Sequence, residues 1–422
     1  MELQKIESKR TGDYYFKGRH ASGLAVYLYP KENSSSTHAM FGTRYGSMDN
    51  CFQRSDESSP ETVPEGIAHY LEHKLFESQE GDAFARFAET GASANAFTSF
   101  ESTCYLFTCT DRLYDSLEIL LDFVQSPYFT KETVEKEQGI IGQEIRMYDD
   151  MPEWRVMFEY LKAMYHTHPV RIDPAGTVES IAQITSELLY RCYHTFYNLH
   201  NMQLVLAGKF DVDKVLEVCD RMLKPAPPVR VERILQPEPS TVLRASTETS
   251  LSVAMPLFQF GYKDSGKPRN EQDLAAMHIL LSIMASDASP LFRQLMDQEL
   301  INDSSFSYQY FEGTGFATVM FGGESREPER VASLIRQETA RLQREGVPAE
   351  AFQWAKRSQY GEGVAGLNSA TGVANWLMNL TFHGLEPFAY IDALAALTIE
   401  QVAEKLAVFQ DDRSVLSVIR PL

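Results

Sequence analysis

In the first half of the chain, apolar residues recur first at the spacing of a helix and then at the spacing of a strand. Residues 65–77 and 82–89 have apolar positions at helical spacing. Small and polar side chains then alternate along residues 93–109, with a break at 101–102. A two-residue period interrupted once is typical of two strands joined by a turn. This order predicts two helices followed by a β-hairpin.

The second half of the chain repeats this order of elements. Residues 271–284 and 291–300 have apolar positions at helical spacing, and a Ser-Pro pair supplies an N-cap and a first-turn proline for the second helix. Residues 305–321 then alternate as two strands around a glycine-containing turn. Helices followed by hairpins, twice over, predict an α+β domain repeated in tandem.

A proline-rich stretch divides the 422 residues into two parts of ordinary domain size. It holds five prolines within fifteen positions, which disfavours helices and inner strands. A single hydrophobic core stops growing at roughly 250 to 300 residues, so more than one domain is expected. We predict an N-terminal domain at residues 1–223, a linker at 224–240 and a C-terminal domain at 241–422.

Composition and charge exclude several classes of function. Hydrophobic residues make up 44% of the chain, which is enough for folded cores. The net charge of −19 argues against nucleic acid and membrane surfaces as partners, because both attract a cationic face. Neither a targeting signal nor an uninterrupted apolar run of about 18 residues is visible. The five cysteines lack any Cys-x-x-Cys spacing. We therefore expect a cytoplasmic protein without a membrane span.

Two histidines and a glutamate form the motif with the clearest chemistry. His69 and His73 are four residues apart in a predicted helix, so their imidazoles leave the same face about 5 to 6 Å apart at Cβ and can converge on one ion. Glu72 lies beside them, where a carboxylate can take a proton from water. The order His-x-x-Glu-His is the inverted zincin pattern. A chance match, with a solvated or core histidine pair, is the other interpretation.

A catalytic zinc site needs a third protein ligand and leaves its fourth position to water. Residues 132–148 have the pattern of a helix, on which Glu137 and Glu144 share one face. One carboxylate could bind the metal while the other orients a ligand histidine. A solvated acidic face explains the same spacing, so these residues alone leave both interpretations open.

The motif and its flanks resemble the pitrilysin or insulin-degrading-enzyme family of insulinase-like inverzincin metallopeptidases, which includes the mitochondrial processing peptidase. The resemblance implies one Zn²⁺ per chain, bound by His69, His73 and Glu144. It also implies that Glu72 is the catalytic base and that Glu137 is a supporting catalytic carboxylate. Family members of about this length contain two homologous domains, each a mostly antiparallel sheet covered by helices. Half-length bacterial members are the most similar, since their zinc helix also continues as Lys-Leu-Phe-Glu.

A second stretch resembles the strand to which this family adds its substrate. Asn95, Ala96, Phe97 and Thr98 match this substrate-edge hairpin. The resemblance implies that they bind a peptide as an added edge strand, which selects for unfolded segments and short peptides.

One departure from the family pattern concerns the number of subunits. Active relatives use an arginine and a tyrosine, seven apart, to hold the substrate. Met296 and Asp303 occupy these positions here, and nearby Arg293, Tyr308 and Tyr310 lack the family spacing. The resemblance therefore implies a heterodimer with a homologous metal-free partner that supplies the pair, with a homodimer as the alternative.

The expected function is that of a zinc metalloendopeptidase subunit, a hydrolase that cleaves peptides or unfolded segments. The alternative is a non-catalytic peptide-binding scaffold subunit of the same fold. A lyase with the same inverted motif, as in the quorum-signal ribosyl-homocysteine enzyme, is more remote because that enzyme is far shorter. His166 and His168 could bind a metal, but a turn before a helix explains them better. His278 has no partner histidine one turn away.

Overall fold

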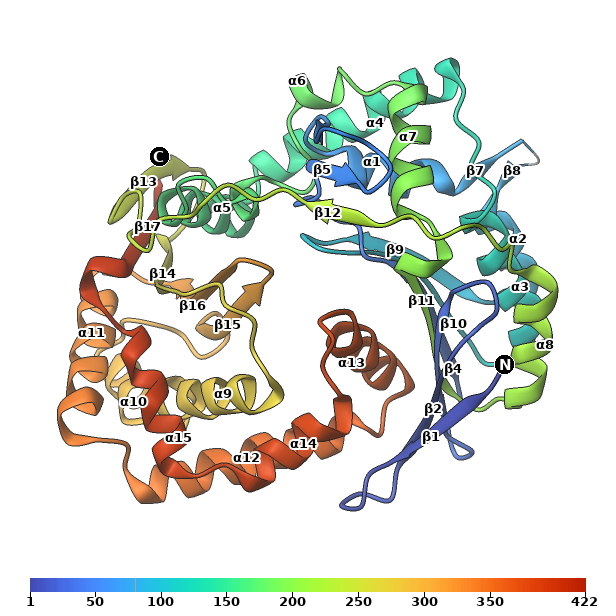
Figure 1. Ribbon diagram of the computed structural model, residues 1–422. Coiled ribbons are helices and arrows are strands. Elements are labelled where there is room, and N and C mark those ends of the chain that lie inside the picture. Colours follow the sequence, from blue (N-terminus) through green and yellow to red (C-terminus); the bar gives the residue numbers. More distant parts are fainter. Residues whose placement is uncertain (80) are drawn as a thin grey trace. The chain divides into compact units, whose positions relative to one another are not determined.

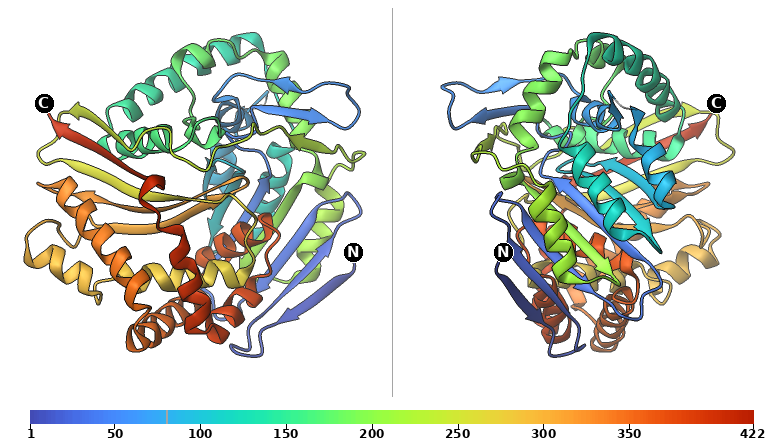
Figure 2. Two further views of the ribbon diagram at one scale, coloured as in Figure 1. Left: turned by 60° about the vertical axis from the view of Figure 1, so that its left-hand side comes forward. Right: turned by 90° about the vertical axis from the view of Figure 1, so that its right-hand side faces the viewer.

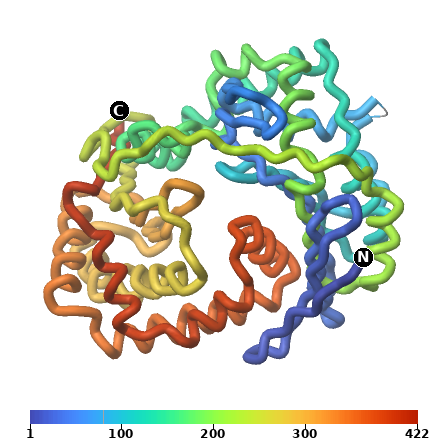
Figure 3. Tube along the Cα trace, viewed as in Figure 1, coloured from blue at the N-terminus to red at the C-terminus, as the bar shows by residue number. Residues whose placement is uncertain are grey.

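The computed structural model describes residues 1–79 and 81–422, which form two compact units (Figure 1). Unit 1 comprises Met1–Ile145, Ile172–Ile234 and Val364–Phe388. Unit 2 comprises Arg146–Arg171, Leu235–Gly363 and Ala389–Leu422. Each unit is thus assembled from three separate stretches of the chain. In Figure 3, unit 1 takes the blue and much of the green trace together with a red segment near the end of the sequence.

The core of unit 1 is a seven-stranded sheet. Its strands, in spatial order, are β1 (Leu3–Glu7), β2 (Tyr14–Arg19), β3 (Ala25–Pro30), β11 (Met202–Gly208), β4 (Thr37–Thr43), β10 (Thr103–Cys109) and β9 (Ser93–Thr98). All neighbours are antiparallel except β3 and β11. The central strands β4 and β11 are buried along their whole length. Strand β9 is the last in the order, so one of its edges is free to pair.

Helices cover both faces of this sheet. Figure 2 shows α2, α3 and α8 on one face and α13 on the other. The helices of unit 1 are α1 (Ile67–Leu75), α2 (Ala83–Thr90), α3 (Leu113–Val124), α4 (Lys131–Asp149), whose last turn belongs to unit 2, α6 (Val178–Ile181), α7 (Ser186–Phe196), η2 (Leu199–Asn201), α8 (Val212–Met222) and α13 (Ala370–Phe382). Two small sheets complete the unit, with strands β12 (Val231–Arg233), β5 (Cys51–Arg54) and β6 (Glu61–Thr62), and β7 (Glu77–Ser78) and β8 (Gly81–Asp82).

Unit 2 is built on a five-stranded sheet. Its spatial order is β13 (Ser246–Leu251), β17 (Ser414–Pro421), β14 (Leu257–Asp264), β16 (Phe316–Glu324) and β15 (Ser307–Gly313). Its helices are α5 (Pro152–Met164), η1 (Pro169–Arg171), α9 (Glu271–Ala285), α10 (Pro290–Asp297), α11 (Pro328–Glu345), α12 (Ala349–Gly366), α14 (Pro387–Ala396), α15 (Ile399–Glu404), η3 (Lys405–Val408) and η4 (Asp411–Arg413). The hydrophobic core lies between the sheet and α9, α10 and α11.

The two sheets share one pattern of strand order and direction. Strands β3, β11, β4, β10 and β9 begin with a parallel pair and continue antiparallel to a free edge. Strands β13, β17, β14, β16 and β15 do the same. This correspondence confirms the predicted α+β fold with two similar domains. The helices and hairpins expected from the periodicity are α1, α2, β9 and β10 in the first half, and α9, α10, β15 and β16 in the second.

Two helices do not follow the division predicted at residues 224–240. Each of them packs in the unit that is formed mainly by the other half of the sequence. Helix α5 comes from the first half of the sequence and packs on β13, β14 and β17 of unit 2. Helix α13 comes from the second half and packs on β3, β4 and β11 of unit 1. Each unit is therefore discontinuous in sequence. Apolar spacing shows which face of a helix is buried but not against which sheet it packs.

The proline-rich stretch is attached to both units rather than free. Its strand β12 pairs with β5 in unit 1. Farther along, Glu238 accepts hydrogen bonds from the backbone N–H groups of residues 166–168 and from Lys263 in unit 2. Part of the predicted linker is thus a strand, because prolines flank residues 231–233 without interrupting them.

One stretch among the described residues is long and apolar enough to cross a membrane by length and composition. It is Glu271–Asp297, with a mean hydropathy of 1.4. Most of it is buried within the protein, and it contains the core helices α9 and α10. Core helices of folded domains pass the same test of length and composition.

Candidate metal centre

Helix α1 carries the histidine motif and begins at a glycine for a steric reason. Gly66 has φ of +88°, and a Cβ there would lie 2.5 Å from the Ala175 carbonyl oxygen. Only glycine fits this position, because a side chain would clash with the carbonyl oxygen and because the backbone is in the left-handed region. Nearly all residues of the helix are buried, among them the apolar Ile67 and Leu71. This packing fixes the face from which His69 and His73 project.

The structure brings the two histidines together with a carboxylate from helix α4. His69 Nε2 lies 3.8 Å from Glu144 Oε1, and His73 Nε2 lies 3.4 Å from Glu144 Oε2. One donor atom from each of the three side chains lies within 4.8 Å of the others. Among the described residues this is the one group of three or more such side chains found close enough to share an ion.

Glu137 holds the second histidine in the orientation that a metal ligand needs. His73 donates from Nδ1 to Glu137 Oε1 at 2.9 Å, which leaves the lone pair of Nε2 directed toward Glu144. Glu137 is itself buried. Burial alone would lower the pKa of His73, but the hydrogen bond with Glu137 and the charges of Glu72 and Glu144 raise it above the usual value. The contact with Nδ1 is the one through which Glu137 would support a metal-binding histidine.

His69 is less exposed than His73. Its ring is buried, and Nδ1 has no hydrogen-bond partner within residues 1–79 and 81–422. Burial, together with the neighbouring His73, lowers the pKa of His69 to about 4. The imidazole is therefore neutral at pH 7, the form that binds metals.

Glu72 lies between the histidines and the edge strand of the sheet. The Thr98 hydroxyl of β9 donates to Glu72 Oε2 at 2.7 Å. Burial raises the pKa of Glu72, and the hydrogen bond from Thr98 opposes this effect. The expected peptide-binding strand thus touches the expected base directly. Both residues were predicted from the sequence to belong to the site, but the hydrogen bond between them was not.

Two further side chains of α1 hold α4 in place. The Tyr70 hydroxyl donates to the Val134 carbonyl, and the fully buried Lys74 ammonium donates to the Thr133 carbonyl at 3.3 Å. Lys74 also forms an ion pair with Glu77. These bonds join the zinc-motif helix to the first turn of the helix that carries Glu137 and Glu144. Their positioning role was not predicted from the sequence.

The donor set fits a zinc ion. Ligands about 2.0–2.2 Å from a tetrahedral ion are about 3.3–3.6 Å apart, close to the 3.4 and 3.8 Å measured from Glu144 to the two imidazoles. Two imidazoles and a carboxylate are ligands typical of catalytic zinc sites, in which the fourth position is left open.

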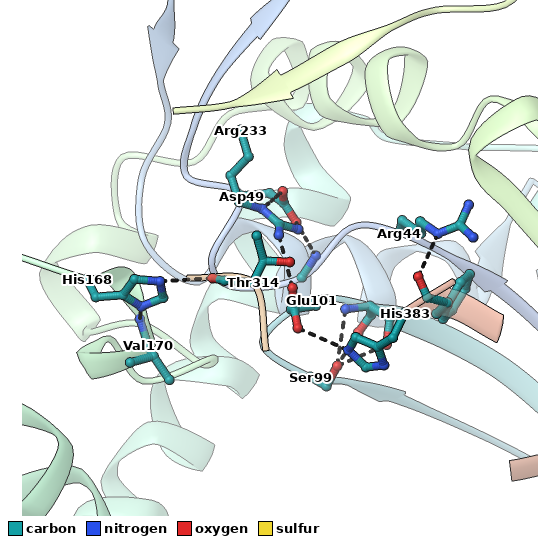
Figure 4. A network of polar contacts seen from close by, with 12 residues as sticks. Arg44, Asp49, Ser99, Glu101, His168, Val170, Arg233, Thr314 and His383 are labelled. Carbon is teal, nitrogen blue, oxygen red and sulfur yellow. Dashed lines mark hydrogen bonds and ion pairs between the residues drawn. The ribbon is translucent and has the colours of Figure 1, made fainter. Parts of the chain in front are cut away.

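Two other histidines considered from the sequence, His168 and His278, have structural hydrogen bonds through their rings. His168 accepts at Nδ1 from the Val170 N–H and donates from Nε2 to the Thr314 carbonyl at 3.0 Å (Figure 4). His278 Nδ1 forms a 2.7 Å hydrogen bond with the Tyr390 hydroxyl. These contacts favour the structural interpretation of both residues.

The positions considered for an arginine and tyrosine pair lie in unit 2. Met296 and Arg293 are on α10, and Asp303 lies in the turn before β15. Tyr308 and Tyr310 are on β15, where the Tyr310 hydroxyl donates to Asp264.

Comparisons with known proteins identify the family of the chain. The profile of the insulinase family (peptidase family M16) matches residues 59–177, and that of the peptidase M16 inactive domain matches residues 183–359. A Bacillus subtilis protein described as the uncharacterized zinc protease YmfH is 39% identical over 412 residues, 95% of each chain. A crystal structure described as an M16-like peptidase of Alicyclobacillus acidocaldarius is 36% identical with a TM-score of 0.92, covering 100% of this chain and 99% of that one.

A more distant comparison concerns chain length. Pitrilysin is 15% identical with a TM-score of 0.76, and the match covers 99% of this chain but 46% of pitrilysin. This likeness shows the fold, and it shows that the present chain corresponds to about half of the longer protein.

Proposed function

Because this chain belongs to the insulinase family, peptidase family M16, we propose that it is the zinc-binding subunit of a peptide-hydrolysing enzyme. His69, His73 and Glu144 are the residues that would hold one Zn²⁺ ion. The convergence of their donor atoms from two helices, with Glu72 beside them, is the observation that carries the proposal. Zinc, when bound, supplies a Lewis acid that polarises a peptide carbonyl and makes water more acidic.

Glu72 is the proton carrier in this proposal. Its Oε2 accepts from Thr98, which fixes the carboxylate and leaves Oε1 to take a proton from the attacking water. The same carboxyl group then gives the proton to the amine that leaves. Glu137 keeps His73 in its ligand orientation throughout, because its bond with Nδ1 involves neither the water nor the substrate.

The free edge of β9 would receive the peptide. Asn95 Oδ1 accepts from the Ala96 N–H at 2.9 Å, so this N–H is not used in pairing with β10 and faces the open edge. A peptide strand would replace Asn95 as the acceptor for this group. Main-chain pairing of this kind accepts many sequences, but only in extended form. We therefore propose unfolded segments and short peptides as the substrate class.

The proposal includes a second subunit. Met296 and Asp303 offer neither a cation nor a phenol, so a homologous metal-free partner would supply an arginine and a tyrosine to the substrate. The expected assembly is a heterodimer, and a self-sufficient homodimer is the second possibility. Peptidase assays of this chain with and without a homologous companion subunit distinguish the two.

The variant Glu72→Gln tests the function. It keeps the side chain's shape and an acceptor for Thr98 but cannot carry the proton. We expect an unchanged zinc content and at least a roughly 100-fold loss of cleavage of an unfolded probe such as β-casein. Glu135→Gln, on the solvent-exposed side of α4, is the matched control and should leave cleavage unchanged. Undiminished cleavage by Glu72→Gln would remove Glu72 from the mechanism.

A non-catalytic peptide-binding scaffold of the same fold is the competing function. It predicts no stoichiometric zinc and no cleavage by the wild-type chain, with or without a companion. Elemental analysis therefore separates the two functions before any activity assay.

A further inference from the structure

The tip of the hairpin that carries β9 is held by a partly buried ionic network. Arg233, at the end of β12, donates to both carboxylate oxygens of Asp49 at 2.7 and 3.1 Å and to Glu101 Oε1 at 3.1 Å. His383 Nε2 lies 3.2 Å from Glu101 Oε2 (Figure 4). Four segments far apart in the sequence thus meet at this point. We refer to Asp49, Glu101, Arg233 and His383 as the hairpin clamp.

The loop that carries Asp49 forms a cradle for the hairpin turn. The backbone N–H groups of Ser47 and Met48 donate to the carbonyls of Ser99 and Phe100 at 3.1 and 2.9 Å. Gly46 lies so close to the turn that a Cβ there would be 2.5 Å from the Phe100 carbonyl oxygen. The Gly46 N–H in turn donates to Asp49 Oδ2 at 2.8 Å. Asp49 therefore orders the cradle, and Arg233 fixes Asp49.

The remaining side of the clamp is the end of helix α13. His383 follows this helix, and the Arg44 guanidinium donates to the carbonyls of Thr381 and Phe382, both at 3.2 Å. These bonds add side-chain donors to carbonyl groups at the helix end, where the Thr381 carbonyl also accepts from the Gly384 N–H at 3.2 Å. The contact between His383 and Glu101 thus joins a helix anchored on the sheet to the hairpin turn.

The pair of Asp49 and Arg233 is the more buried part of the clamp, whereas His383 is on the surface. Asp49 is 4% exposed and Arg233 is 18% exposed. A planar guanidinium that binds a carboxylate through two parallel bonds gives fixed geometry as well as attraction. Removing one partner leaves the other charge buried and unpaired, which is much more costly than losing a surface ion pair.

The clamped turn follows directly after the residues that the proposed reaction uses. Ser99, whose carbonyl is held by the cradle, is the neighbour of Thr98, which donates to Glu72. Strand β9 has β10 on one side and a free edge on the other, and besides the turn it is attached by packing on α1 and α2. A shift at the turn therefore moves Thr98 and the edge N–H of Ala96.

We propose that the hairpin clamp sets the position of β9 and that Arg233 is thereby a positioning residue for peptide binding. This role rests on the proposed function. Arg233 is in β12, and the chain passes from unit 1 to unit 2 directly after Ile234. The segment that joins the two units is thus tied to the strand that receives the peptide. Detachment of β12 would release the hairpin and weaken peptide binding.

Hydrogen exchange on the full chain tests the clamp without any reference to catalysis. In Arg233→Met we expect the amides of residues 46–50 and 93–103 to exchange at least about 10-fold faster. Arg233→Lys should have an intermediate effect, because lysine keeps the positive charge but cannot donate two parallel hydrogen bonds to Asp49. Because Arg233→Met leaves Asp49 unpaired and can prevent folding, Glu101→Gln is a second variant that keeps the pair of Arg233 and Asp49. Arg191→Met, which removes an arginine bound to Glu57 and Glu61, is the control.

Binding of fluorescein-labelled β-casein, measured by anisotropy in the non-cleaving Glu72→Gln background, tests the consequence. We expect at least a roughly fivefold weaker Kd in Arg233→Met and Glu101→Gln, partial recovery in Arg233→Lys, and no change in zinc content or in the Arg191→Met control. Unchanged exchange in the hairpin, or faster exchange with unchanged casein binding, overturns the proposal. If exchange and binding change as expected while the wild-type chain cleaves nothing, with or without a homologous companion subunit, the clamp stands and the proposed peptidase function fails.

Discussion

Replacement of Glu137 should weaken zinc binding by an amount that the geometry defines. The carboxylate is 8% exposed and accepts a 2.9 Å hydrogen bond from His73. A buried hydrogen bond to a charged group contributes about 1.5–3 kcal/mol, and a neutral one about half as much. Glu137→Ala should therefore weaken zinc binding about 10- to 100-fold, and Glu137→Gln, which keeps an acceptor for Nδ1, by roughly fivefold.

Competition with a chelator of known affinity measures this change directly. The zinc affinity of Glu135→Gln serves as the control, because Glu135 is on the exposed face of the same helix and the variant loses the same charge. We predict that wild type and Glu135→Gln bind zinc equally tightly, that Glu137→Gln binds it more weakly, and that Glu137→Ala binds it most weakly. An affinity for Glu137→Ala within twofold of wild type would refute the argument that this carboxylate orients a zinc ligand.

Two further predictions concern other bonds in the structure. Thr98→Val removes the donor to Glu72 without changing its size and should lower kcat for casein cleavage about 10-fold at unchanged zinc content; an unchanged kcat contradicts the role of this bond. Burial raises the pKa of Glu238, but the bonds from Lys263 and from the N–H groups of residues 166–168 outweigh it and lower the pKa to about 2. Its stabilising effect is present above about pH 4.5 and is lost as pH falls toward 2. Glu238→Gln should thus lower the free energy of unfolding by about 1–2 kcal/mol at pH 7 and by little at pH 2, measured by urea unfolding; an equal loss at both pH values contradicts the assignment.

The local elements of the fold could be predicted because each has its own periodic signal. Helix α1 and strand β9 follow from apolar spacing alone, and so does the repeat of helices and hairpins in the second half. The exchange of α5 and α13 could not be predicted. Each helix buries an apolar face whichever sheet it meets, so the choice of sheet depends on tertiary packing. For the same reason β12 was included in a linker, since a three-residue strand has too few positions to show a period.

The candidate metal ligands could be predicted more completely than the residues that position them. His69 and His73 share a helical face at fixed spacing, and the family resemblance supplied Glu144 and Glu137 from a second helix. The clamp and the helix-joining bonds of Tyr70 and Lys74 left no comparable signal. An arginine within a proline-rich stretch resembles any solvated charge until the fold places a buried carboxylate beside it. Contacts of that kind depend on how separate segments meet.

The central claim is that two imidazoles and the carboxylate of Glu144 bind a single zinc ion. Elemental analysis of the purified chain after addition of zinc and removal of the unbound ion by dialysis against metal-free buffer tests it most directly, with Glu144→Ala and the control Glu135→Ala measured in parallel. We predict about one zinc per chain in the wild type and the control, and less than about a tenth of that in Glu144→Ala. Full zinc retention by Glu144→Ala, or no zinc in the wild type, would contradict the account.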